Sequence, residues 1–177
     1  MMKPSNIFFI GPMGAGKTTI GRSLANALQY EFVDSDHEIE TRAGANIAWI
    51  FDVEGEEGFR NREEAVIDEL SLSQGIVLAT GGGAILRKET RQRLKQRGLV
   101  VYLKASAEQI LKRTAKDKKR PLLQTKNRDK VVRELLKKRD PLYQEIADIT
   151  IATRNDKISD VTQSILRQIK AIANNSD

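Results

Sequence analysis

The sequence predicts an α/β fold of three layers, in which a five-stranded parallel sheet lies between two layers of helices. Five short runs rich in Val, Ile and Phe are typical of buried strands, and segments with helical spacing separate them. A glycine-rich loop joins the first run to the first helical segment. The strands are expected at residues 7–10, 31–33, 76–79, 99–103 and 149–152. Strands that alternate with helices pair in parallel, because each helix provides a right-handed crossover.

The first and last predicted helices each carry one apolar stripe that would pack against the sheet. The stripes consist of Ile20, Leu24, Ala27 and Leu28, and of Val161, Ile165, Ile169 and Ile172. Ser106 followed by Gln109 has the pattern of a capping box, which predicts that another helix starts there.

A chain of 177 residues is long enough for one sizeable core, and we expect a single domain that spans residues 1–177. Two segments do not fit a simple alternation of one strand and one helix. Residues 34–74 form an insert with helical stretches around residues 47–51 and 62–72. Residues 114–127 are polar, lack an apolar period and contain Pro121, so we expect this segment to be mobile.

The composition argues against several classes of protein. The first 25 residues show no basic start before a long apolar region, and nowhere do 18 apolar residues run together. We therefore expect a cytoplasmic protein with no membrane partner. The absence of Cys excludes disulfides and thiolate metal sites, and the single His argues against a zinc or iron site. Any bound metal should be a hard ion with oxygen ligands.

Charge is unevenly distributed along the chain, whose net charge is +6. Residues 31–69 contain thirteen acidic and three basic residues, whereas residues 104–139 contain fourteen basic and four acidic residues. The basic segment fits a nucleic acid, a small polyanion or simply a solvated helix face. Because no aromatic residue interleaves with the basic run at residues 112–138, a platform for stacking nucleic-acid bases is not expected.

Residues 11–18 match the phosphate-binding motif G-x-x-x-x-G-K-[ST], in the required position between a strand and a helix. Its glycines let backbone N–H groups converge on phosphate oxygens, and the helix N-terminus adds partial positive charge. Lys17 can reach the β- and γ-phosphates of a nucleoside triphosphate, and the Thr18 hydroxyl can ligate Mg²⁺. The nucleotide-binding residues expected in this loop are Gly14, Ala15, Gly16, Lys17, Thr18 and Thr19.

Polar and glycine residues also follow the second and third predicted strands. Asp34 and Asp36 lie at a strand end, where ligands collect in an open parallel sheet. One carboxylate near Mg²⁺ and one near a substrate hydroxyl would serve phosphoryl transfer to an alcohol, and the alternative is that one aspartate caps the next helix. Three glycines at residues 81–83 would offer N–H groups to a ligand or form a flexible turn. His37 is expected to be an exposed helix residue rather than a base.

Three arginines are further candidates, although each taken alone also fits a surface charge. Arg60 follows the acidic "GEEGF", Arg120 precedes Pro121 in the polar segment, and Arg139 precedes "DPLY". Two such side chains can hold a carboxylate by bidentate pairing, and an arginine on a closing loop can stabilise a transferring phosphate.

Six blocks of the sequence together resemble the shikimate kinases, small P-loop kinases of the nucleoside monophosphate kinase structural class. The blocks are "GPMGAGKTTIGRSLA", "FVDSDHEIE", "IFDVEGEEGFRNREE", "LATGGGA", "RPLL" and "RDPLYQEIAD", in the order and approximate spacing of that family. The resemblance covers nearly the whole chain. It implies the strand order 2-3-1-4-5, a substrate-binding helical insert at about residues 34–74 and a mobile lid at about residues 112–126.

The resemblance implies ATP-dependent phosphorylation of the 3-hydroxyl of shikimate, in the pathway to chorismate and the aromatic amino acids. ATP would be the co-substrate, Mg²⁺ the cofactor and shikimate the small-molecule partner, and we expect a monomer that binds no nucleic acid. By position, Asp36 resembles the base candidate beside the accepting hydroxyl. Arg60 and Arg139 resemble the pair that grips the substrate carboxylate. The glycines that resemble the loop closing the same pocket are Gly81, Gly82 and Gly83.

On the donor side, the resemblance pairs Asp34 with Thr18 as the groups near Mg²⁺. Arg120 resembles the lid arginine that reaches the transferring phosphate, so the implied catalytic residues are Lys17, Asp36 and Arg120. For adenine or phosphate, the candidates are Arg113 in the region before the lid and Arg154 in the loop after the last strand.

Three rival functions make different predictions. A gluconate kinase shares the phosphate-binding loop but is not expected to combine "DSD", "GGG" and "RDPLY". A nucleoside monophosphate kinase needs an acceptor pocket that tolerates phosphate, which Asp34 and Asp36 would repel. A nucleic-acid-dependent ATPase could use the basic segment, and steeply salt-dependent retention of DNA or RNA would favour it.

Overall fold

The computed structural model describes residues 4–117 and 123–175. Its strands form one parallel sheet in the order β2-β3-β1-β4-β5, which confirms the predicted fold class and strand order. The observed strand ends differ from the predicted ones by at most one residue. In chain order the elements are β1 (Asn6–Ile10), α1 (Lys17–Leu28), β2 (Glu31–Asp34), α2 (Ser35–Ala43), α3 (Ile47–Leu70), β3 (Ile76–Ala79), the 3-10 turn η1 (Ala84–Leu86), α4 (Lys88–Arg97), β4 (Leu99–Lys104), α5 (Ala107–Arg113), α6 (Arg128–Ile146), β5 (Ile149–Ala152) and α7 (Ile158–Asn174).

Helices cover both faces of the sheet. Because successive residues of a strand point to opposite sides, alternate side chains belong to different core clusters. In β1, Ile7 and Phe9 belong to one core cluster, whereas Phe8 and Ile10 belong to another.

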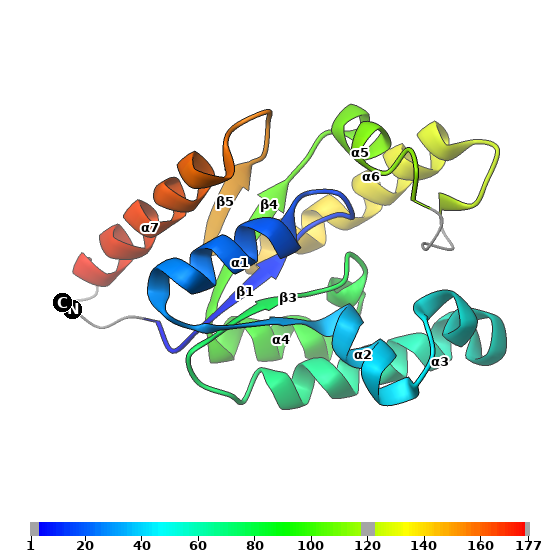
Figure 1. Cartoon of the computed structure of the whole chain (residues 1–177), viewed down its shortest axis with the longest axis horizontal. Helices are drawn as coiled ribbons and strands as arrows, with labels where there is room; N and C mark the ends of the chain where they lie inside the picture. The colour runs from blue at the N-terminus through cyan, green and yellow to red at the C-terminus, as the bar shows by residue number, and fades with distance from the viewer. Residues whose placement is uncertain (1–3, 118–122, 176–177) are drawn as a thin grey trace.

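The first cluster includes most of the predicted apolar stripes of α1 and α7, but the predicted members Ala27 and Ile172 are exposed, and Ala25 is buried instead of Ala27. The second cluster includes side chains of α3, α4 and α6. Figure 1 shows α1 and α7 on the opposite side of the sheet from α4. Burial on both faces explains why the central strands read as continuous apolar runs.

The ends of β1, β2 and β3 meet at one edge of the sheet. Asp34 of β2 pairs with Ala79 of β3, which in turn pairs with Phe9 of β1. Thr80 fixes the next loop to this edge, because its N–H and its hydroxyl both donate to the Phe9 carbonyl, at 3.1 and 2.8 Å. The glycine-rich loop, the two aspartates and the three glycines are thereby brought side by side.

The segment predicted as an insert consists of α2 and α3. Figure 1 shows α2 and the first part of α3 toward the right-hand end of the molecule, and the rest of α3 runs back toward α4. Gly55 interrupts α3 with φ 71° and ψ 179°, a conformation that is essentially restricted to glycine. This kink separates the two helical stretches that the sequence predicts. Ile39 of α2 packs with Ile50, Phe59 and Val66 of α3 in a third, smaller core. The insert therefore has its own apolar centre.

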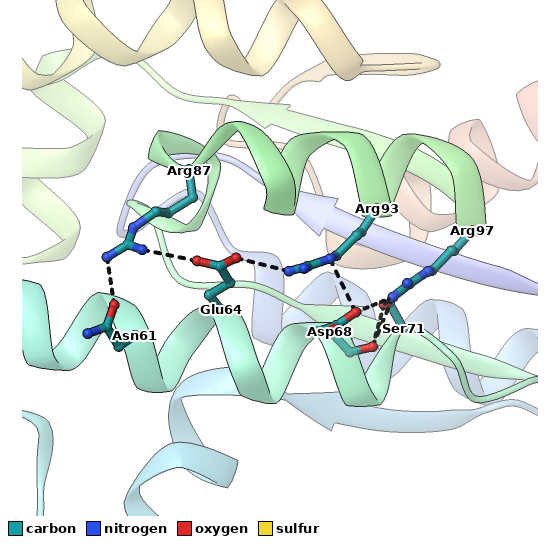
Figure 2. A network of polar contacts seen from close by, with 7 residues as sticks. All are labelled: Asn61, Glu64, Asp68, Ser71, Arg87, Arg93 and Arg97. Atoms are coloured by element: carbon teal, nitrogen blue, oxygen red, sulfur yellow. Dashed lines mark hydrogen bonds and ion pairs between the residues drawn. The ribbon is translucent and has the colours of Figure 1, made fainter.

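A ladder of ion pairs fixes the half of α3 after the kink to α4 (Figure 2). Glu64 contacts Arg87 at 3.1 Å and Arg93 at 3.0 Å. Arg93 also contacts Asp68 at 3.3 Å, and Asp68 pairs with Arg97 at 2.7 Å. The hydrogen bonds at the two ends of the ladder are made by Asn61 and Ser71. A network of this kind orders its side chains better than isolated surface pairs do, and it holds this half of α3 beside the sheet.

The helix starting after Ser106 confirms the predicted capping box. The Ser106 hydroxyl accepts from the Gln109 N–H at 3.2 Å, and the Gln109 side chain accepts from the Ser106 N–H at 3.0 Å. Within residues 4–117 and 123–175, no helix is both long enough and apolar enough to cross a bilayer.

Of the lid predicted at about residues 112–126, the structure describes the last two residues of α5 and residues 114–117 and 123–126 between α5 and α6. Residues 118–122, and with them Arg120, lie outside the described residues. The mobility of this segment and the role of Arg120 stay predictions.

Candidate active site

A cavity of about 840 Å³ opens where the three strand ends meet. Its volume lies at the upper end of the usual range for small-molecule sites, roughly 300–1,000 Å³. Twelve of the residues predicted from the sequence line it: Gly14, Gly16, Lys17, Thr18, Thr19, Asp34, Asp36, Arg60, Gly81, Gly82, Gly83 and Arg139. The predicted residues Ala15, Arg113 and Arg154 do not line it. His37 lies exposed on α2, as the sequence predicts, although it also borders the cavity.

The glycine-rich loop wraps around the start of α1. Gly14 and Gly16 have φ values of 73° and 96°, which residues with a Cβ atom rarely adopt. Lys17, the first residue of α1, donates from Nζ to the carbonyls of Gly11 at 2.6 Å and Pro12 at 2.8 Å. Its ammonium group therefore lies over the loop, beside the helix N-terminus that would attract phosphate.

Asp34 caps the next helix, which is the alternative that the sequence left open, and it also contacts Thr18. Its Oδ1 caps α2 by accepting from the N–H groups of Asp36 at 3.0 Å and His37 at 3.2 Å. Its Oδ2 accepts from the Thr18 hydroxyl at 2.8 Å. The Thr18 hydroxyl and Oδ2 of Asp34 are both oxygens that can ligate a hard metal ion, and they lie within hydrogen-bonding distance of each other at the cavity.

This pair of oxygens fits Mg²⁺, which usually keeps several waters and binds through one or two protein groups plus phosphate oxygens. The described part of the chain contains no cluster of three or more His, Cys, Asp or Glu side chains that could hold a metal ion.

The cavity also contains two carboxylates that converge on Gly81. A Cβ atom at Gly81 would lie only 2.6 Å from Oε2 of Glu63 and 2.9 Å from Oδ1 of Asp36. The Gly81 N–H donates to the Ser35 hydroxyl at 3.2 Å, which fixes this backbone against α2. A side chain at position 81 would therefore displace one or both carboxylates from the positions that they have here.

Glu63 is a site residue that the sequence reasoning missed. It is 2% exposed, and its Oε1 accepts from Nη1 of Arg60 at 2.6 Å. Burial raises the pKa of Glu63 to about 7; the guanidinium of Arg60 opposes this shift, Asp36 adds to it and Arg139 opposes it. The available signal was its spacing, since residues three apart on a helix share one face.

We expect the stability of the protein to reflect this raised pKa. The folded state binds the Glu63 proton more strongly than the unfolded chain, so the stability that it contributes is present below about pH 4.5 and is lost as the pH rises through about 7. Glu63→Gln removes this titration. Thermal unfolding should give a difference in Tm, wild type minus variant, that is more positive at pH 5 than at pH 8. The same difference at both pH values would contradict the assignment.

Two buried arginines reach the cavity from different helices. Arg60 of α3 is 7% exposed and Arg139 of α6 is 5% exposed, and both line the cavity. A Cβ atom at Gly83 would run into the Arg60 guanidinium, so the glycine leaves room for that side chain in its present position. Two cations held at one cavity form a site for a carboxylate or another small anion.

Arg113 lies behind the glycine-rich loop rather than in the cavity. Its Nη1 donates to the Gly14 carbonyl at 2.9 Å, and its Nη2 donates to the Arg154 carbonyl at 2.9 Å. It therefore joins α5, the phosphate-binding loop and the loop after β5. The Arg154 side chain itself is exposed.

Comparison with known proteins agrees with this geometry. The family model described as shikimate kinase matches residues 13–170. Shikimate kinase of Vibrio cholerae serotype O1 is 57% identical over 170 residues, which cover 96% of this chain and 98% of that protein. A solved structure of shikimate kinase from Acinetobacter baumannii in complex with shikimate is 55% identical, with a TM-score of 0.93 and coverage of 94% of this chain and 93% of the other.

A second solved structure, shikimate kinase from Aquifex aeolicus, is 33% identical, with a TM-score of 0.83 and coverage of 95% of this chain and 98% of the other. The similarity in sequence and the similarity in fold both extend over almost the whole chain. The protein belongs to the shikimate kinase family.

Proposed function

We propose that this protein transfers the γ-phosphate of ATP to the 3-hydroxyl of shikimate and releases ADP, a step toward chorismate and the aromatic amino acids. The observation that carries the proposal is the pair of buried arginines, Arg60 and Arg139, which line the same cavity as Asp36. Two guanidinium groups suit a carboxylate, and Asp36 suits a hydroxyl of the same molecule. The shikimate complex of the Acinetobacter relative supports this choice of acceptor.

On the donor side, backbone N–H groups of residues 14–19 and the start of α1 hold the phosphates of ATP. Lys17 neutralises charge on the β- and γ-phosphates, replacing its contacts with the loop carbonyls by contacts with phosphate oxygens. Thr18 and Asp34 hold Mg²⁺, which supplies further neutralisation of phosphate charge when it is bound.

On the acceptor side, the arginine pair fixes one end of the shikimate ring, and position then decides which hydroxyl faces the donor. Asp36 accepts a hydrogen bond from that hydroxyl and orients it in line with the γ-phosphate. Because phosphoryl transfer passes through a loose transition state, positioning and charge stabilisation contribute more than early proton removal. Gly81, Gly82 and Gly83 allow the backbone to close against the substrate.

Three more arginines complete the proposed donor site. We propose that Arg120 reaches the transferring phosphate from the lid, where such residues contribute about 10³- to 10⁵-fold in rate. Arg113 holds the phosphate-binding loop through the Gly14 carbonyl and presents its guanidinium toward the adenine side. Arg154, in the loop after β5, borders the same part of the donor site, where its carbonyl accepts from Arg113.

The charges of the site favour shikimate over the rival acceptors. Asp34 and Asp36, which both line the cavity, would repel the phosphate dianion of AMP. Gluconate carries a carboxylate but is an open chain, so ordering it between the arginines and Asp36 costs more conformational entropy than ordering a ring.

The experiment that tests this function is a coupled assay of ADP release with purified protein, Mg²⁺ and ATP. Shikimate, gluconate and AMP are offered separately at equal concentrations. Only shikimate should stimulate ADP release strongly. Failure of shikimate to stimulate it, or equal stimulation by AMP, would reject the proposal.

A further inference from the structure

A buried tyrosine lies directly behind the three-glycine loop. Tyr143 of α6 is fully buried, and its hydroxyl donates to the Gly82 carbonyl at 2.5 Å. Gly82 and Gly83 line the cavity, whereas Tyr143 does not. The loop therefore has the cavity on one side and the tyrosine hydroxyl on the other.

The contact with the carbonyl of Gly82 also fixes the N–H of Gly83, because both groups belong to one planar peptide. The described residues contain no cis peptide bond, so this N–H points away from the carbonyl and hence away from Tyr143. Within the described part of the chain, the Gly83 N–H donates to no protein acceptor. It is a donor on the cavity side of the loop, available to an anionic or hydroxylated ligand.

Glycine peptides rotate easily, so this donor needs an external restraint. A side chain at position 83 would restrict this rotation, but its Cβ atom would run into the Arg60 guanidinium. The restraint comes from Tyr143 instead. Burial raises the pKa of Tyr143 to about 12, although the neighbouring Arg139 lowers it, so the phenol remains a hydrogen donor near neutral pH.

Tyr143 also links the loop to the acceptor arginine. Arg139 and Tyr143 are four residues apart on α6 and share one face of the helix. Both side chains line one small second cavity, and the charge of Arg139 lowers the pKa of Tyr143. Tyr143 thus lies beside both the loop and the arginine that line the main cavity.

We propose that Tyr143 is a positioning residue for the phosphate acceptor: its hydroxyl locks the Gly82–Gly83 peptide so that the Gly83 N–H faces the substrate beside Arg139. This inference rests on the proposed function, because the substrate held there is the carboxylate-bearing acceptor shikimate.

Tyr143→Phe tests the proposal because it removes the hydroxyl and keeps the ring. We expect the KM for shikimate to rise about five- to tenfold, which corresponds to the loss of one hydrogen bond. The kcat and the KM for ATP should stay within about twofold of wild type. Equilibrium binding of shikimate without ATP, followed through the single tryptophan Trp49 of the insert, should weaken by the same factor.

Tyr102→Phe is the matched control. Tyr102 is as buried as Tyr143, its ring stacks on Tyr143 with centroids 4.9 Å apart, and its hydroxyl donates to Asp140 at 2.6 Å. Both variants should lose a similar amount of Tm, but only Tyr143→Phe should change the KM for shikimate.

An unchanged KM for shikimate in Tyr143→Phe, or an equal rise in Tyr102→Phe, would overturn the inference while shikimate turnover by the wild type still supports the proposed function. Absence of shikimate turnover by the wild type would instead overturn the proposed function, and the inference with it.

Discussion

Asp36→Asn is expected to lower kcat by about 10²- to 10³-fold, the usual contribution of a group that handles a proton in the transition state. Asparagine keeps the size of the side chain but cannot accept the proton of the attacking hydroxyl. The KM for ATP should change little, because Thr18 and Asp34 lie between Asp36 and the phosphate-binding loop. Steady-state kinetics with shikimate and ATP varied separately measure both effects.

The control for this variant is Asp52→Asn, on an exposed aspartate of the same insert. It makes the same chemical change away from the cavity and should leave kcat and both KM values within about twofold of wild type. A kcat for Asp36→Asn within threefold of wild type would show that Asp36 does not accept the proton, because the amide oxygen of asparagine can still orient the hydroxyl.

Arg139→Ala is expected to raise the KM for shikimate by about 100-fold, since charge-assisted hydrogen bonds contribute about 1.5–3 kcal/mol. Arg139 is 5% exposed and lines the cavity, so water cannot replace its contacts easily. Arg139→Lys should recover only part of the loss, because an ammonium group cannot pair with a carboxylate in a bidentate manner. Initial rates over a range of shikimate concentrations give the KM of each variant.

The neighbouring Lys138→Ala provides the control, because Lys138 is exposed on the same turn of α6. It should leave the KM for shikimate unchanged. If Arg139→Ala instead raised the KM for ATP and left that for shikimate near wild type, Arg139 would belong to the donor side and the acceptor site would need another anchor.

The strands of the sheet could be predicted because a strand that is buried on both faces has a continuous run of apolar residues. Even β2, a partly exposed edge strand, was found from the apolar pair Phe32 and Val33 and the polar residues that follow them. The strand order could not be predicted from hydrophobic periodicity, because it depends on the direction in which each crossover runs. The expected order came from the resemblance to a family.

The parts of the site that lie on strand ends could also be predicted, because the topology brings such ends together. Glu63 and Tyr143 could not. Their roles depend on burial beside Arg60 and beside Gly82, and Gly82 is 61 positions from Tyr143 in the chain. The spacing of Glu63 from Arg60 is compatible with a contact on one helix face, but neither Glu63 nor Tyr143 has a local sequence pattern that shows burial beside the site.

The contacts of Arg113 could not be predicted from the sequence either. The sequence placed it near adenine or phosphate, and the structure shows it holding two backbone carbonyls, one of them in the phosphate-binding loop. A contact between a side chain and a distant carbonyl leaves no residue pattern to read. Direct contact of Arg113 with a nucleotide stays a proposal.

The central claim is that the arginine pair and Asp36 together present the 3-hydroxyl of shikimate to ATP. The most direct measurement is a two-dimensional phosphorus–proton NMR correlation spectrum of the product formed from shikimate, ATP and Mg²⁺. A single phosphate ester that correlates with the ring proton at carbon 3 is the predicted result. Inorganic phosphate as the only new phosphorus signal, or an ester at a different hydroxyl, would contradict the claim.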